Sequence, residues 1–151
     1  MLRARISDAL KTAMKSKQTH TVSTVRLIMA ALKDRDIAAR PKGNGDGISD
    51  DEILSMLQSM IKQRRESVEM YEKGGRAELA QQEESEIEII QTFLPEQMDD
   101  AALSAAVKEI VGEAGATSLK DMGKVMGLLK ERYAGEMDFS KASAQVKNQL
   151  S

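Results

Sequence analysis

Apolar residues recur along this chain three or four positions apart, which is the spacing of helices that bury one face. No alternating apolar and polar run of useful length predicts a strand. Seven helices are expected, at about residues 2–17, 19–39, 50–73, 76–93, 100–111, 118–133 and 138–150. We therefore predict an all-α fold, with a four-helix N-terminal part over residues 1–95 and a three-helix C-terminal bundle over residues 96–151.

Local signals predict where several of these helices begin and end. Ser49 and Glu52 form a capping box ahead of the third helix. Pro41 disfavours helix in the residue before it, and the glycine-rich stretch at 41–47 predicts an exposed loop. The other expected N-terminal caps are Thr19 or Thr21, Asp99 or Asp100, Thr117 or Ser118, and Asp138.

The third and fourth helices are expected to fold back on each other at Gly74-Gly75. That turn brings Arg64 and Arg65 level with the glutamates of the fourth helix. Arg64 lies on the apolar stripe of its own helix, so it either extends its head group outward or pairs with Glu83 or Glu86 in a half-buried bridge. We interpret this group as structural rather than catalytic.

Two glycines, Gly123 and Gly127, lie one turn apart inside the predicted sixth helix. Each costs a helix interior about 1 kcal/mol relative to alanine. Their common face is bare backbone, which lets another helix, a nucleic-acid backbone or a partner protein approach closely. The alternative is that they let the fifth and seventh helices pack tightly on the sixth.

Composition excludes several classes of site. The chain has no cysteine and a single histidine, His20, so thiolate nucleophiles and cysteine-ligated metals are excluded and no histidine cluster exists. No phosphate-cradling glycine loop or nucleophile with a partner base is recognisable, so no catalytic residue, cofactor or metal site is predicted. No apolar stretch of about 18 residues and no leader segment is seen, which predicts a cytoplasmic protein with no membrane contact.

Charge is distributed unevenly around the net value of −2. Residues 1–40 carry nine basic against three acidic side chains, residues 41–100 carry six against fifteen, and residues 101–151 carry seven against six. The basic first segment either meets phosphate or neutralises the acidic middle of the same fold.

Three ordered segments resemble those of a known family. Residues 26–37 (RLIMAALKDRDI) resemble the N-terminal signature of YqeY-like proteins. Residues 71–79 (YEKGGRAEL), followed by Glu83, Glu86 and Phe93-Leu94-Pro95, resemble their middle signature. Residues 121–127 (DMGKVMG) are similar to the C-terminal tail of GatB, the tRNA-handling subunit of the glutamyl/aspartyl-tRNA amidotransferase. The resemblance implies a YqeY-like N-terminal domain at 1–95 and a GatB-tail-like domain at 96–151.

The same resemblance implies a non-catalytic, tRNA-associated adaptor, with tRNA or a protein of the translation or aminoacyl-tRNA machinery as partner. It also implies a family-level label of carbon–nitrogen ligase with glutamine as amido-N-donor, although no group in the chain supplies that chemistry alone. The alternative is a protein–protein interaction module with no RNA role. The candidate RNA or partner contacts are Lys120, Gly123, Lys124, Gly127 and Lys130, with Arg26, Lys33 and Arg35 as a second basic area.

Overall fold

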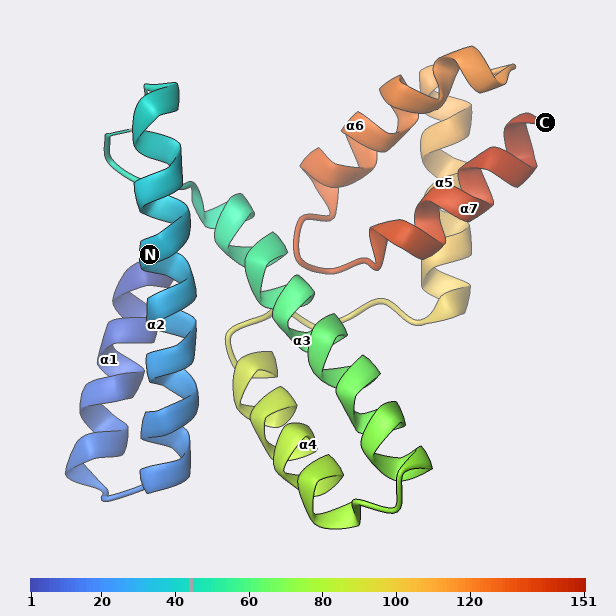
Figure 1. Cartoon of the computed structure of the whole chain (residues 1–151). Coiled ribbons are helices and arrows are strands. Elements are labelled where there is room, and N and C mark those ends of the chain that lie inside the picture. Colours follow the sequence, from blue (N-terminus) through green and yellow to red (C-terminus); the bar gives the residue numbers. More distant parts are fainter. Residues whose placement is uncertain (44) are drawn as a thin grey trace. The chain divides into compact units, whose positions relative to one another are not determined.

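A computed structural model describes residues 1–43 and 45–151; Asn44, within the predicted loop, lies outside the described residues. The described residues form seven α-helices and no strand, which confirms the all-α prediction (Figure 1). The helices are α1 (Leu2–Lys15), α2 (Thr19–Ala39), α3 (Asp50–Lys73), α4 (Ala77–Gln91), α5 (Asp100–Ala114), α6 (Met122–Arg132) and α7 (Phe139–Leu150). Among the described residues, none of these helices has the length and apolarity needed to cross a membrane.

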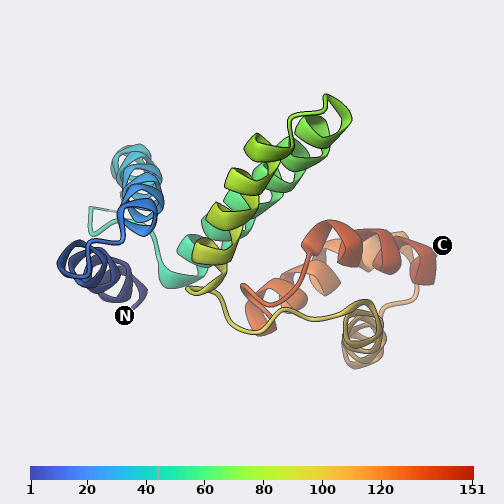
Figure 2. The same ribbon diagram turned by 90° about the horizontal axis from the view of Figure 1, so that it is seen from below.

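The chain divides into two compact units, unit 1 (Met1–Pro95) and unit 2 (Glu96–Ser151). In unit 1, α1 lies beside α2 and α3 lies beside α4, as Figures 1 and 2 both show. The inner faces of these two pairs share one core, in which Val25, Ile28 and Leu57 have no exposed surface. Burying a side chain of this size stabilises the fold by about 1.5–3 kcal/mol.

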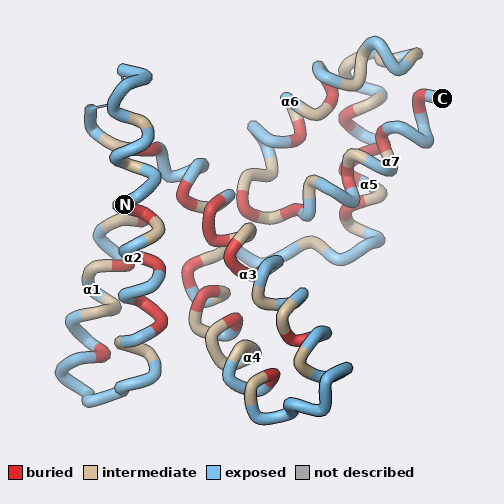
Figure 3. The backbone as a smooth tube through the Cα atoms, viewed as in Figure 1, coloured by how far each residue is buried: buried red, intermediate tan, exposed pale blue. Residues whose placement is uncertain are grey.

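Unit 2 has a separate core, to which all three of its helices contribute. Val107, Leu129 and Val146 come from α5, α6 and α7 and are fully buried. Buried and exposed positions alternate along each helix with the helical period (Figure 3). One apolar stripe per helix is therefore enough to account for the fold of this unit.

Most of the predicted caps are present. Ser49 Oγ accepts from the amide of Glu52 at 3.2 Å while the Glu52 carboxylate accepts from the amide of Ser49 at 3.3 Å. Asp99 accepts from Ala102 at 2.7 Å, which caps α5. The prediction for α2 is wrong, because Gln18 precedes this helix and no side chain caps it.

Short 3-10 turns account for two further differences. Arg40–Lys42 forms such a turn after α2, because Pro41 can occupy the first turn of a helical segment where its missing N–H is not needed. Leu119–Asp121 forms another ahead of α6, so the α-helix begins at Met122, four residues after Ser118. Gly112 and Gly115 were both expected to close the fifth helix. α5 passes Gly112, continues to Ala114 and stops at Gly115 with φ +62°.

Candidate functional site

Most side chains of the glycine-containing motif on α6 have a structural role within unit 2. The carboxylate of Asp121 accepts from the amide of Thr117 at 3.0 Å and so fixes the turn that leads into the helix. Val125 is fully buried, and Met122 and Met126 are partly buried against the same core. These positions explain why the motif forms a helix here.

Gly123 and Gly127 have no such role. Both are exposed, and a Cβ built at either position would meet no neighbouring side chain or segment within 4 Å. Tight packing of α5 and α7 is therefore not the reason for these glycines, contrary to the second of the two alternatives. Each glycine lowers helix stability relative to alanine. α6 is therefore less stable than it would be with alanines at these positions, and no contact of the two glycines within the unit offsets that loss of stability.

The three candidate lysines near this face differ in their contacts. Lys120 and Lys130 are exposed and form no salt bridge within the described part of the chain. Lys124 donates from Nζ to the carbonyl of Ala114 at 3.2 Å. Ala114 is the last residue of α5, whose final carbonyl groups lack helical partners and carry the negative end of the helix dipole. Lys124 thus acts as a C-terminal cap for α5.

Replacing Lys124 by alanine is expected to lower the free energy of unfolding by about 0.5 kcal/mol, because both the hydrogen bond and the charge–dipole attraction are lost. Urea denaturation measures the change, with Lys120→Ala as the control, since Lys120 is an exposed lysine of the same segment that makes no such contact. Equal losses in the two variants would show that the cap contributes nothing.

The second basic area lies on α2, where Arg26, Lys33 and Arg35 are all exposed. Arg26 and Lys33 are two helical turns apart and therefore share a face. Arg35 follows Lys33 by two residues and points to a different side of the helix. The structure thus brings two of the three residues together. Lys33 also lines a pocket formed by α1 and α2.

The predicted pairing between α3 and α4 involves Arg64 and Glu86. Arg64 donates from Nε to the Glu86 carboxylate at 2.9 Å, and the two side chains are only 14% and 13% exposed. Burial raises the pKa of the neighbouring Glu83 carboxyl, the charge of Glu86 adds to that shift, and Arg64 opposes it. Arg65 is exposed, and no salt bridge joins it to either glutamate among the described residues.

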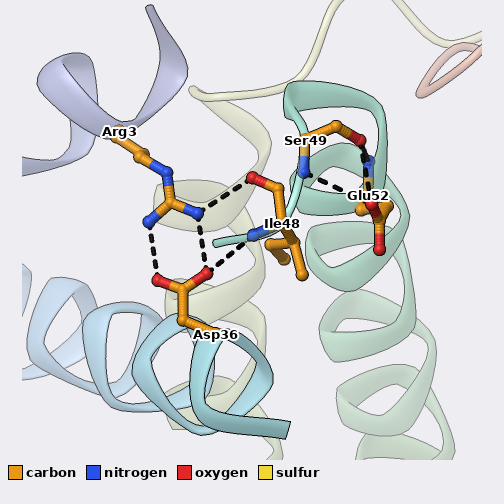
Figure 4. Close-up of polar contacts among 5 residues, drawn as sticks. All are labelled: Arg3, Asp36, Ile48, Ser49 and Glu52. Carbon is orange, nitrogen blue, oxygen red and sulfur yellow. Dashed lines mark hydrogen bonds and ion pairs between the residues drawn. The ribbon is translucent and has the colours of Figure 1, made fainter. Parts of the chain in front are cut away.

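A second polar group, which the sequence interpretation missed, joins α1, α2 and the segment before α3 (Figure 4). Arg3 Nη1 and Nη2 each donate to the Asp36 carboxylate at 2.7 Å, and Nη2 also donates to the carbonyl of Ile48 at 2.9 Å. The amide of Ile48 donates back to Asp36 at 2.9 Å. We call Arg3, Asp36 and Ile48 the clasp.

The residue before Ile48 fits the clasp only as glycine. Gly47 has φ +94°, and a Cβ there would lie 2.5 Å from Arg3 Nη2 and 2.6 Å from Asp36 Oδ1. The hydrogen bonds from Arg3, together with the bond from the Ile48 amide, lower the pKa of Asp36 to about 2 against the effect of burial. The signal available in the sequence was a glycine, Gly47, two residues ahead of the capping-box serine, but no local pattern indicates that Arg3 and Asp36 contact this segment.

The clasp is suited to holding segments together rather than to acid–base chemistry. Asp36 remains a carboxylate at neutral pH and is held by three hydrogen bonds, whereas a general base works best with a pKa near the working pH. Among the described residues, no three histidine, aspartate or glutamate side chains are placed to share a metal ion. Two open surfaces within the described residues are the glycine face of α6 and the pocket beside α2.

Curated relatives align with most of this chain. A protein of Schizosaccharomyces pombe named only as uncharacterised is 32% identical over 95 residues, which cover 63% of this chain and 73% of that protein. Proteins named "Altered inheritance of mitochondria protein 41, mitochondrial" are 30% identical in Lachancea thermotolerans and 31% in Eremothecium gossypii. These alignments cover 80% and 83% of this chain but 66% and 63% of the relatives, so the chain spans slightly less than two thirds of their length.

Two predictions are corrected by these names. The tRNA-associated adaptor function is contradicted, because the relatives are named for the inheritance of mitochondria and not for tRNA handling or amide ligation. The cytoplasmic location is contradicted as well, because the same relatives are named as mitochondrial proteins. The adaptor role came from the resemblance to the amidotransferase tail, which covers only the last third of the chain. The cytoplasmic location was inferred from the lack of an apolar segment and of a leader, and such an absence does not specify a compartment.

The family resemblance itself is confirmed. The family model described as "Yqey-like protein" matches residues 3–150, which is nearly the whole chain and includes both units. The clasp, the Arg64–Glu86 pair and the open face of α6 all lie inside the matched range. The chain belongs to the YqeY-like family.

Proposed function

We propose that this chain is a protein-interaction module in which the glycine face of α6, with Gly123 and Gly127 at its centre, receives a helix of a partner protein. The observation that carries the proposal is the open space outside both glycines. The two glycines lower the stability of α6 at positions where nothing in its own unit packs. This face is therefore suited to close contact with the backbone of a partner protein.

The surroundings of this face favour a protein partner. Leu119, one turn before Gly123, is 47% exposed, and Met126 is partly buried beside Gly127. Apolar contact area next to bare backbone is typical of helix-to-helix packing. The charge of residues 101–151 is nearly balanced, with seven basic and six acidic side chains, whereas a dedicated nucleic-acid surface carries a marked basic excess.

We also propose that the two units are separate domains with the arrangement that the family resemblance implies. Residues 1–95 would be the YqeY-like N-terminal domain of four helices, and residues 96–151 the three-helix bundle similar to the amidotransferase tail. The separate apolar cores of the two units support this proposal.

Replacing Gly127 by alanine is expected to raise stability and to weaken partner binding at once. The added methyl group meets no atom of the unit, so the free energy of unfolding should rise by about 0.5–1 kcal/mol. The same group stands between α6 and an approaching backbone, so an immobilised variant should retain less of its partner from an extract of the source cells. Thermal unfolding and quantitative mass spectrometry measure the two effects.

Gly112 offers a matched control, because it is a helical glycine of α5 that is also open to solvent. Gly112→Ala should raise stability to a similar extent and leave the retained protein unchanged. Equal retention by Gly127→Ala and the unaltered chain would contradict a docking role for this face, as would loss of the partner in both alanine variants.

A further inference from the structure

A second open surface lies on unit 1, at a pocket of about 200 Å³ between α1 and α2. Its lining combines two buried side chains, Ile6 and Leu32, with two exposed ones, Met29 and Ile37. The buried pair forms an apolar floor, and the exposed pair stands at the rim. Met29 and Ile37 are 36% and 46% exposed, so this apolar surface continues beyond the pocket.

The pocket also carries net positive charge. Arg3 and Asp36 line it, but their charges cancel because they are paired in the clasp. The remaining charged residues of the lining are Lys33 and Arg40, which gives a net charge of +2. Within the described residues, neither of these two side chains forms a salt bridge, and both are exposed. The charge of Arg40 also acts on the Asp36 carboxylate from a longer distance. The clasp therefore fixes the pocket while leaving two cations available.

The volume indicates what kind of group fits. Pockets that enclose a small-molecule ligand or cofactor usually measure about 300–1,000 Å³. At about 200 Å³, this one is too small to enclose such a ligand but large enough for a single apolar side chain. A pocket of that kind, with polar or charged groups around its rim, is typical of the anchor points at which protein interfaces concentrate their binding energy.

We propose that the α1/α2 pocket binds an acidic segment of a partner protein, which inserts one apolar side chain between Met29 and Ile37 and places carboxylates against Lys33 and Arg40. Charge complementarity selects the acidic segment, since the lining has two unpaired cations. This surface belongs to unit 1 and includes no residue of α6. This proposal can therefore be tested independently of the proposed docking face on unit 2.

The test uses the full chain and a short fluorescein-labelled peptide that carries one leucine flanked by glutamates. The fluorescence anisotropy of the labelled peptide should rise as the chain is added, with half-saturation at a chain concentration of about 0.1 mM or below. Replacing the leucine of the peptide by alanine should weaken binding by about tenfold or more. Affinity should also fall several-fold between about 50 mM and 200 mM salt, because exposed charges are screened over a shorter distance at the higher salt concentration.

Variants of the chain locate the binding surface. Ile37→Glu should weaken peptide binding by at least about tenfold, because it removes an apolar rim residue and repels the peptide. The matched control is Leu27→Glu: Leu27 is also on α2 and also 46% exposed, but it lies outside the pocket lining. That variant should bind within about twofold of the unaltered chain.

A charge exchange separates recognition from loss of folding. Lys33→Glu should weaken binding of the glutamate peptide and improve binding of a peptide in which lysines replace the glutamates, an improvement that a misfolded protein would not show. No binding of the acidic peptide, equal loss in Ile37→Glu and Leu27→Glu, or failure of the exchange would each overturn the proposal. None of these results would bear on the glycine variants of α6.

Discussion

Replacing Arg64 by methionine is expected to lower the free energy of unfolding by about 2–3 kcal/mol. The guanidinium is 2.9 Å from Glu86, and both side chains are almost nine-tenths buried. Methionine fills much of the same volume but leaves Glu86 without its partner and close to Glu83. Two carboxylates then share a partly desolvated site, which is the costliest way to break such a pair. Urea denaturation at neutral pH measures the loss.

The pH dependence of this variant has a definite direction. The pKa of Glu83 is already raised by burial and by Glu86, and Arg64 opposes that rise, so removing Arg64 raises it further. A carboxyl with a raised pKa binds its proton more tightly in the folded state, so stability falls as pH rises through its titration. The penalty should therefore be larger at pH 7 than at about pH 5.

Two further variants control for Arg64. Arg65→Met should change stability by less than about 0.5 kcal/mol, because Arg65 is exposed and unpaired with these glutamates. The double variant Arg64→Met with Glu86→Leu should recover much of the loss, since Glu83 then no longer faces a second, unpaired carboxylate. Similar losses from Arg64→Met and Arg65→Met would refute the account of this pair.

Removing the carboxylate of the clasp, by Asp36→Ala, should cost about 2 kcal/mol. Three hydrogen bonds join Asp36 to Arg3 and Ile48, all of them charge-assisted, and they tie α1 and the segment before α3 to α2. Asp34→Ala is the control, because Asp34 is an exposed aspartate of the same helix that forms none of these contacts. Denaturant unfolding of both variants at neutral pH makes the comparison.

Acid titration tests the clasp, and the expected change of stability with pH is opposite in sign to that expected for Glu83. The pKa of Asp36 is lowered from 3.8 to about 2 in the folded chain. Because the pKa of Asp36 is lower in the folded chain than in the unfolded chain, its ionised carboxylate contributes fully to stability above the unfolded pKa. That stability is lost as pH falls through the folded pKa, so the loss lies between about pH 4 and pH 2. The Asp36→Ala variant should show a shallower loss of stability in this range. Parallel acid curves for the two proteins would contradict the assignment.

Much of the fold could be predicted from the sequence because its signals are local. Apolar periodicity defines the helices, and the caps at Ser49 and Asp99 act on amides three residues away. The pairing of Arg64 with Glu86 is nearly as easy to predict, because a tight turn at Gly74-Gly75 makes α3 and α4 run antiparallel to each other. Here a nonlocal contact follows from a local turn.

The clasp could not be predicted in the same way. Arg3 is 33 residues from Asp36 and 45 from Ile48, and each of the three residues is unremarkable in its own segment. The α6 glycines present a different problem. Sequence spacing shows that Gly123 and Gly127 share a face, but the direction of that face depends on how the whole unit packs, which the spacing does not specify.

The docking role of α6 is tested most directly by photo-cross-linking in the source cells. Benzoylphenylalanine replaces Lys120 or Lys130, which are exposed and flank the glycine face. The control position is Lys108, an exposed residue of α5. The proposal predicts that positions 120 and 130 capture the same protein and that position 108 does not. Capture of the same proteins from all three positions, capture of nucleic acid, or no capture at positions 120 and 130 would contradict it.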